Sequence, residues 1–187
     1  EGSNLNNGSE SSPFLTIDHS LTQGCIDSSA TQAQVTIHLE EGIYSPSLTG
    51  EVFPIILPSY VTLVGSGEGT ILDAEQTQRV IVIDTVEDVS ISDLSIINGL
   101  VDGIEYGGGI NCVSSDPVIN NVFMSGNSAY GGGAIYLESS SPTLTNMTIS
   151  GNTVTHSGGG LYVYGNGSPY LDNVIFNGNI GLNGLGD

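Results

Sequence analysis

Three stretches of the chain repeat one pattern: GGGINCVSSDPVINNVFMSGN (107–127), GGAIYLESSSPTLTNMTISGN (132–152) and GGGLYVYGNGSPYLDNVIFNGN (158–179). Each has glycines, a short alternating strand, a Ser-Pro or Asp-Pro turn, a second strand and a final Gly-Asn. The prolines of the turns, Pro117, Pro142 and Pro169, lie 25 and 27 residues apart. A repeat of this length is typical of a solenoid in which each copy forms one coil.

The same coil length extends toward the N-terminus. The apolar segments VTIHLEEGIY, VTLVGSGEGTILDA and VSISDLSIING begin at Val35, Val61 and Val89, which are 26 and 28 residues apart. Short strands rich in Val, Ile, Leu and Thr at this period stack as parallel sheets. We therefore predict a single all-β domain, 1–187, folded as a right-handed parallel β-helix of about six coils. Its expected parts are an N-terminal cap (1–34), irregular coils (35–105) and regular coils (106–187).

The cap is expected to contain the one helix of the chain. The segment SSPFLTIDHSLTQG (11–24) places Phe14, Ile17 and Leu21 at helical spacing, after a Ser-Pro start and before Gly24. A helix there covers the open end of the first coil, which otherwise exposes core side chains and unpaired strand edges.

Alternation along the strands assigns the two faces of each sheet. In the strand after each glycine run, the residues expected to point inward are Ile110, Cys112, Ile135, Leu137, Leu161 and Val163. A bridge between Cys25 and Cys112 would cross several coils at about 4.8 Å each, beyond the roughly 7 Å limit between Cα atoms. We therefore predict two free thiols.

The charge balance restricts the partners. The chain has 20 acidic residues and one basic residue, Arg79, which we expect to pair with Asp73, Glu75 or Asp84. Such a field repels phosphate backbones and anionic lipids, so we expect no nucleic-acid partner. No apolar run approaches the roughly 18 residues that span a bilayer, and we expect no membrane insertion.

These repeats resemble the pectin-lyase-like right-handed parallel β-helix repeats of bacterial and archaeal surface proteins. The opening segment GSNLNNGSESSPFLTIDHSL looks like their entry into the cap helix. GGAIY at Gly132 and FNGN at Phe176 are also similar to motifs of the polymorphic outer-membrane adhesins of chlamydiae, with Met124 and Ile149 replacing Phe in the sister repeats. The resemblance implies a β-helix fold and a secreted or cell-surface location, and it leaves the activity open.

Three groups of residues are candidates for a site or a structural column. The outward residues Tyr136, Tyr162 and Tyr164, beside Asn111 and Glu138, offer rings on which a glycan or a partner surface can stack, although solvent-facing strand residues have the same pattern. The carboxylates Asp102, Glu105 and Asp116 lie where adjacent coils can share calcium, or they are simply solvated. The column Asn121, Asn146 and Asn173, with Asp93 one coil earlier, predicts an inward ladder of stacked amides. Asn127, Asn152 and Asn179 suit turn positions with positive φ.

The sequence favours a non-catalytic role. The β-helix lyases that the chain resembles are expected to use an Arg or Lys as base, and the chain has no Lys and a single Arg. The hydrolases of this fold are expected to have clustered Asp pairs and a Gly-His-Gly segment, and the sequence contains neither. We therefore expect an extracellular structural or adhesive module, with glycans or a host surface as partners. Self-assembly into filaments is a further possibility, through other copies or further coils at an open C-terminal end. The alternative is a carbohydrate-binding or polysaccharide-degrading β-helix, a lyase or a glycosidase, either with or without a dependence on calcium.

Overall fold

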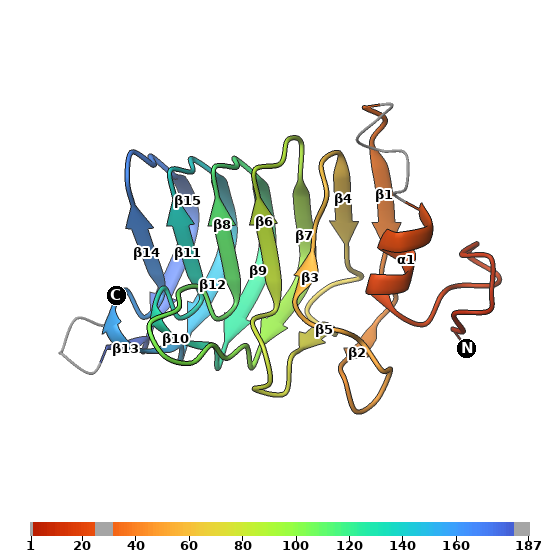
Figure 1. Ribbon diagram of the computed structural model, residues 1–187, viewed down its shortest axis with the longest axis horizontal. Coiled ribbons are helices and arrows are strands. Elements are labelled where there is room, and N and C mark those ends of the chain that lie inside the picture. The colour runs from red at the N-terminus through yellow and green to blue at the C-terminus, as the bar shows by residue number, and fades with distance from the viewer. Residues whose placement is uncertain (1, 25–31, 182–187) are drawn as a thin grey trace.

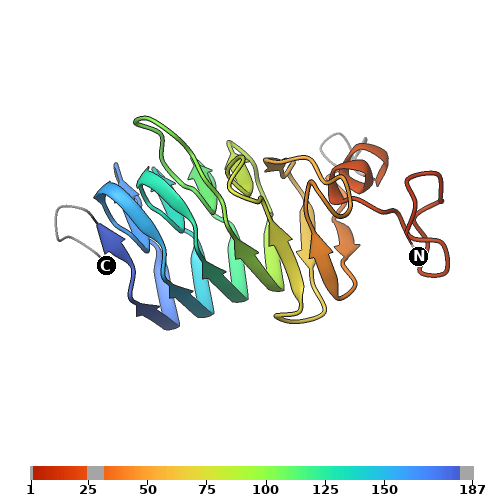
Figure 2. The same ribbon diagram turned by 90° about the horizontal axis from the view of Figure 1, so that it is seen from below.

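The computed structural model describes residues 2–24 and 32–181 and shows a right-handed parallel β-helix of about six coils. The coils stack side by side along the long axis of the molecule, with the N-terminal arm and helix at one end (Figure 1). A view turned by 90° shows the same stack (Figure 2). The all-β class and the number of coils that the sequence period predicts are confirmed.

Three parallel sheets form the sides of the helix. The first sheet contains β1 (Val35–His38), β2 (Gly42–Tyr44), β4 (Val61–Val64), β5 (Thr70–Asp73), β7 (Ser90–Ile97), β9 (Val118–Ser125), β12 (Thr143–Ser150) and β15 (Tyr170–Asn177). The second contains β3 (Ile55–Ile56), β6 (Ile81–Asp84), β8 (Ile110–Val113), β11 (Ile135–Glu138) and β14 (Leu161–Tyr164). The third contains β10 (Ser128–Gly131), β13 (Thr153–Ser157) and β16 (Ile180–Gly181).

The strand register reproduces the coil length read from the sequence. Val35 lies opposite Val61 in the pair β1–β4. Thr62 lies opposite Ser90 in β4–β7, and Ser90 opposite Val118 in β7–β9. Equivalent residues of successive coils therefore form straight columns, so one position in the repeat meets its counterparts in the coils on either side.

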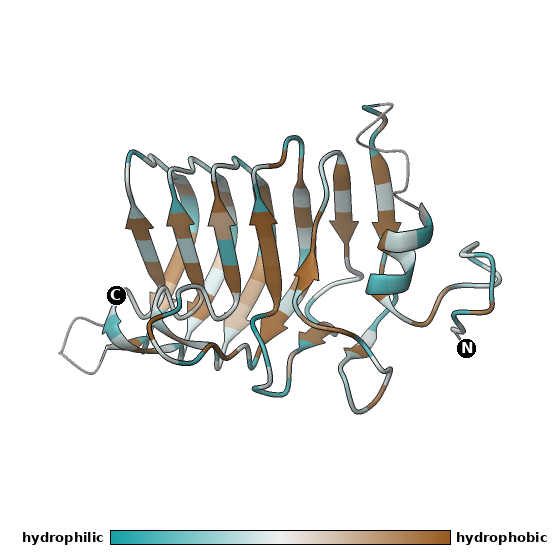
Figure 3. Cartoon of the chain, viewed as in Figure 1, coloured by the Kyte–Doolittle hydropathy of each residue, from teal (hydrophilic) through white to brown (hydrophobic). Residues whose placement is uncertain are grey.

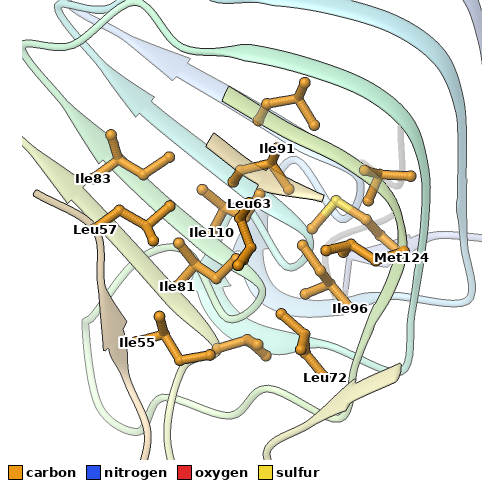
Figure 4. Packing of buried hydrophobic residues seen from close by; sticks show 14 of the residues in the cluster. Ile55, Leu57, Leu63, Leu72, Ile81, Ile83, Ile91, Ile96, Ile110 and Met124 are labelled. Carbon is orange, nitrogen blue, oxygen red and sulfur yellow. The ribbon is translucent and has the colours of Figure 1, made fainter. Parts of the chain in front are cut away.

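The core is a continuous apolar column inside the coils. The inward residues of β8 and β11 that alternation predicts, including Ile110 and Leu137, are fully buried. Figure 3 shows hydrophobic residues alternating with polar ones along several strands. Figure 4 shows Ile81 and Ile110 of the second sheet meeting Ile91 of the first sheet in the interior, with the thioether of Met124 nearby. Such packing removes apolar surface from water at about 25 cal/mol per Å².

The cap helix is present but begins later than the sequence predicts. Helix α1 runs from Ile17 to Gly24, whereas the Ser-Pro signal placed its start near Ser12. The carboxylate of Glu51 accepts the main-chain N–H of Ile17 (2.6 Å) and of Asp18 (3.0 Å), which fixes the first turn of the helix. Glu51 is 34 residues from Ile17, so no local signal in the sequence marks this start.

The helix covers the first coil as expected. Ile17 and Leu21 of α1 belong to the same apolar cluster as Ile37 of β1 and Phe53 before β3. Phe14, the third residue of the predicted apolar face, lies before the helix and packs edge-on against His19, with ring centroids 4.8 Å apart. The cap therefore extends the core by one helical layer.

The last described coil is exposed at the opposite end. Val163 of β14 and Leu171 of β15 continue the inward columns of Leu137 and Leu144, which are fully buried. Val163 and Leu171 themselves are each 38% exposed. The inward direction predicted for Val163 agrees with its register, but its side chain is not enclosed.

The long segment between β7 and β8, which ends in Gly107 to Gly109, crosses the boundary between coils. Both views show this segment, coloured green, running along the molecule toward the later coils (Figures 1 and 2). The main-chain N–H of Gly107 donates to the carbonyl of Gly131 in the following coil (3.0 Å). The segment therefore carries Tyr106, the residue before the glycine run, onto the coils that follow.

Candidate binding site

The ligand-binding candidates from the sequence lie on two adjacent columns of one sheet. Tyr136 of β11 stands between Asn111 of β8 and Tyr162 of β14 in register. Glu138 and Tyr164 form the next outward column. The hydroxyl of Tyr136 donates to Oε2 of Glu138 (3.1 Å), which joins the two columns. The alternation of each strand therefore gathers the five residues on one outer face.

Tyr136 is not open to solvent, in contrast to the outward patch that alternation predicts. Its side chain points out of the coil, yet the residue is only 5% exposed. The ring of Tyr106 covers it, with centroids 4.6 Å apart and planes inclined by 26°. Tyr106 arrives from the long segment between β7 and β8, so the strand pattern alone could not reveal this cover.

Three aromatic residues that the sequence reasoning missed complete the site. They are Tyr106, Tyr130 and His156. A signal for them exists in the sequence: each lies one or two residues before a glycine run, at intervals of 24 and 26 residues, close to the coil period. We call Tyr106, Tyr130, Tyr136, His156, Tyr162 and Tyr164 the aromatic corner.

The rings of the aromatic corner form a platform with one side wall. The plane of Tyr106 lies within 8° of that of Tyr162, with centroids 5.7 Å apart, and Tyr136 and Tyr162 are 5.8 Å apart at 22°. Tyr130 stands at 89° to Tyr106. His156 stacks on the ring of Tyr130 with centroids 4.7 Å apart. Three nearly parallel rings thus lie beside a perpendicular one.

Glycines allow these rings to approach the backbone. A Cβ on Gly131 would lie 3.0 Å from ring atoms Cδ1 and Cε1 of Tyr106. Gly107, Gly132 and Gly158, one in each glycine run, have φ of 72°, 63° and 68°, a left-handed conformation that side chains rarely adopt. The repeated glycine runs therefore turn the chain between the strands and leave room for the rings.

The hydroxyl groups of Tyr136 and Tyr106 stay protonated. Burial raises the pKa of Tyr136, and its hydrogen bond to the Glu138 carboxylate raises that pKa further. Burial also raises the pKa of Tyr106, with smaller contributions from neighbouring tyrosines. These hydroxyls therefore act as hydrogen-bond donors and acceptors, and Glu138 is the carboxylate placed among them.

Part of the aromatic corner faces solvent. Tyr164 is 56% exposed, and Tyr106, Tyr130 and Tyr162 are partly exposed. Between Pro117 and Gly181 the only charged residues are Glu138 and Asp172. Of the accessible rings, Tyr130, Tyr162 and Tyr164 therefore lie on a stretch with few charges, whereas Tyr106 directly follows Glu105.

The carboxylates proposed for calcium are engaged separately. Glu105 pairs with Arg79 at 2.5 Å, and Asp116 accepts the main-chain N–H of Ser141 at 2.5 Å. Asp102 is exposed in the segment between β7 and β8. Within residues 2–24 and 32–181, no group of three or more His, Cys, Asp and Glu is arranged to hold a metal ion. Calcium shared by fewer protein ligands stays a prediction.

The ion pair of Arg79 differs from the expectation. The sequence placed Arg79 against Asp73, Glu75 or Asp84, but its partner is Glu105, one coil later. Asp73 instead accepts the main-chain N–H of Glu75 and the side-chain amide of Asn98. The arginine thereby fastens the chain next to Tyr106 to the preceding coil.

The asparagine column at Asn121, Asn146 and Asn173 is a ladder, but it faces outward. Nδ2 of Asn173 donates to Oδ1 of Asn146 (2.8 Å), and Nδ2 of Asn121 donates to Asp93 (2.7 Å). Asn146 shifts by one position and donates to Asn120 (2.8 Å). All three asparagines are exposed, with φ of 53°, so they bend the long strands at the surface.

The inward ladder is the second column, at Asn127, Asn152 and Asn179. Nδ2 of Asn127 donates to Oδ1 of Asn152, and Nδ2 of Asn152 to Oδ1 of Asn179, both at 2.9 Å. The expectation of positive φ at these residues is wrong, because the preceding glycines, Gly126, Gly151 and Gly178, adopt that conformation. The glycine makes the turn, and the asparagine is free to point into the core.

The free Cys112 is a core residue, as predicted. Its thiol is fully buried and donates to the carbonyl of Ser115 (3.3 Å). Burial raises the pKa of Cys112 to about 11, which keeps the thiol protonated and unreactive. Cys25, the other thiol of the prediction, lies outside the described residues.

None of the helices in the described parts of the chain is long and apolar enough to cross a membrane. No curated protein and no solved structure matches the chain. The resemblance to pectin-lyase-like repeats and chlamydial adhesins therefore stays a prediction, while the parallel β-helix itself is shown. Residues 1–186 match the family described as "Protein of unknown function (DUF1565)". Because that match covers nearly every residue of the chain, the chain belongs to the DUF1565 family.

Proposed function

We propose that this β-helix is a non-catalytic binding module of a secreted or cell-surface protein, with the aromatic corner as its contact surface. The observation that carries the proposal is the platform of Tyr106, Tyr136 and Tyr162, whose planes lie within 26° of one another. Tyr136 is covered by Tyr106, and the partly exposed Tyr106 and Tyr162 supply the ring surface on which a flat ligand such as a sugar ring can stack. The exposed Tyr164 and the adjacent hydroxyl groups supply further contacts.

An adhesive role suits the chemistry of the corner better than hydrolysis. Its carboxylate, Glu138, accepts a hydrogen bond from Tyr136 within the sheet. Hydrolysis of a glycoside needs two carboxyl groups about 5 to 9 Å apart, on either side of the scissile bond. Recognition of a glycan on a host or partner surface needs only the rings and their polar edges.

A glycan array with the purified domain tests this proposal. Tyr162→Ala and Tyr164→Ala should each weaken binding to retained glycans by roughly 3- to 10-fold, the range expected for one aromatic contact. Tyr170→Ala is the matched control, because Tyr170 is 60% exposed and lies on β15 of a different sheet. Equal losses in all three variants would count against the aromatic corner as the contact surface, and no retained glycan would count against a glycan as its ligand.

A structural role by stacking of coils is the second candidate. The partly exposed Val163 and Leu171 continue two buried columns, and the outer edges of β14 and β15 face away from β11 and β12. A second copy, or a further coil, would bury these side chains as each earlier coil does. The partner expected at this end is therefore another coil of the same repeat.

Light scattering across protein concentration, combined with negative-stain images, tests coil stacking. The wild-type domain should form larger particles as its concentration rises. Val163→Ser and Leu171→Ser should reduce them, because less apolar surface is buried at the contact. A monomer at all concentrations, with or without millimolar calcium, would rule out assembly of this chain into filaments.

A further inference from the structure

The aromatic corner combines tyrosine faces with negative charge. Ring faces carry the negative part of the aromatic quadrupole and attract cations that lie within about 6 Å of the ring centre. Tyr106, Tyr136 and Tyr162 give three nearly parallel rings, and Tyr130 stands perpendicular to Tyr106. These rings are in contact with one another, so a ligand reaches them from outside, at the partly exposed Tyr106 and Tyr162 and at the exposed Tyr164.

The charges around the corner all favour a cation. Glu138 lies among the tyrosines, bonded to the hydroxyl of Tyr136. The single arginine of the chain is paired with Glu105, so its charge is compensated next to Tyr106. The net charge of −19 adds a long-range field that raises the local concentration of cations.

We infer that the aromatic corner binds an organic cation, a methylated ammonium group carried by its ligand. This inference rests on the proposed function and adds the chemical class of the ligand. A fully methylated (quaternary) ammonium, such as that of choline, has no N–H groups to satisfy, and it gives up water readily enough to contact ring faces. A neutral sugar would gain the stacking contacts and could donate a hydroxyl hydrogen bond to Glu138, but it would gain nothing from the acidic field.

Choline and its neutral isostere 3,3-dimethyl-1-butanol separate charge from shape. The domain has eight tyrosines and no tryptophan, so binding can be followed by tyrosine fluorescence and by NMR shifts of ring protons. Choline should bind roughly 3- to 30-fold more tightly than the neutral isostere at matched ionic strength, the range expected for cation–π contacts. The difference should shrink as sodium chloride is added.

Variants locate the cation at the aromatic corner. Tyr162→Leu and Tyr164→Leu keep apolar bulk but remove the ring face, and Glu138→Gln removes the charge, so each should weaken choline binding several-fold. Tyr170→Leu should leave binding unchanged, since Tyr170 lies on another sheet. Circular dichroism and thermal unfolding verify that each variant is folded.

The outcomes separate this inference from the proposed function. Equal affinity for choline and the neutral isostere, or an equal loss in Tyr170→Leu, overturns the inference. If neutral glycans bind and lose affinity in Tyr164→Ala while choline does not bind, the contact surface stands and the cation is rejected. If choline binds with the expected variant pattern and no neutral glycan is retained, the inference stands and the ligand is not a neutral glycan.

Discussion

Asn152 lies inside the coil with both ends of its side-chain amide bonded. Its Oδ1 accepts the main-chain N–H and the Nδ2 of Asn127, and its own Nδ2 donates to the carbonyl of Met124 and to Asn179. Asn146, six residues earlier in the chain, carries the same side chain on the outer surface. Substituting each residue in turn therefore measures separately how much the buried ladder and the exposed ladder contribute to stability.

Asn152→Ala should lower the free energy of unfolding by about 2 to 4 kcal/mol, because it leaves the buried main-chain N–H and amide of Asn127 without their acceptor. Asn146→Gly is the matched control: glycine keeps the positive φ of 53° without strain, and only exposed bonds are lost. We expect that variant to cost less than about 1 kcal/mol. Urea unfolding of both proteins measures the difference, and equal costs would contradict the assignment of the inner ladder.

Helix α1 shows which part of an element can be predicted from local sequence. The apolar spacing of Ile17 and Leu21 predicts a helix that covers the first coil, and both residues are buried there. The start of the helix depends on Glu51, a residue of another segment, so the Ser-Pro signal at Ser12 placed it too early.

The aromatic corner could likewise be predicted only in part. Alternation along the strands identified Tyr136 and Tyr162, but the cover of Tyr136 by Tyr106 depends on the path of the long segment between β7 and β8.

Glu51 should make the stability of the cap depend on pH. Burial raises the pKa of its carboxyl above 4.5, and this outweighs the hydrogen bonds from Asp18 and Ile17 that lower it. The folded state therefore binds the proton more tightly, so the contribution of Glu51 is full below pH 4.5 and is lost as the pH rises through the raised pKa. Glu51→Gln has no such proton, and its stability relative to the wild type should rise over this window.

Urea unfolding of wild type and Glu51→Gln at half-unit steps from pH 4 to 7 measures this trend. Glu51→Ala serves as the control for the cap itself and should cost about 1 to 2 kcal/mol at high pH, because Ile17 and Asp18 lose their acceptor. A difference between wild type and Glu51→Gln that is constant with pH, or that moves in favour of wild type as the pH rises, would contradict the raised pKa.

At the scale of the whole molecule, the repeat determines the fold. The cap, the last described coil and the aromatic corner are the features that differ from one part of the stack to another. The period of the prolines predicts the register, and the strands pair as that period requires. The period cannot show that the cap covers the first coil, that Val163 and Leu171 of the last described coil are partly exposed, or that rings gather between Tyr106 and Tyr164. Those features depend on side chains from different coils meeting, which no single repeat encodes.

The open last coil should exchange its amide hydrogens faster than the middle of the stack. Among the strands of residues 2–24 and 32–181, β14 pairs only with β11, whereas β8 pairs with both β6 and β11. Val163 of β14 is partly exposed, while Cys112 of β8 is fully buried. Local opening of the end coil therefore disrupts fewer contacts, and in a linear array each coil is held only by its neighbours. We expect peptides from β14 and β15 to exchange at least about tenfold faster than those from β8 and β9 in hydrogen exchange with mass spectrometry.

Protein concentration then distinguishes an isolated end from a stacked one. If copies associate through the last coil, protection of β14 and β15 should increase with concentration, because the partner pairs their outer edges and covers Leu171. Protection of β8 should stay the same and serves as the internal reference. Equal exchange across all coils at low concentration would mean that the helix opens as one cooperative unit, and the open end would then confer no local weakness.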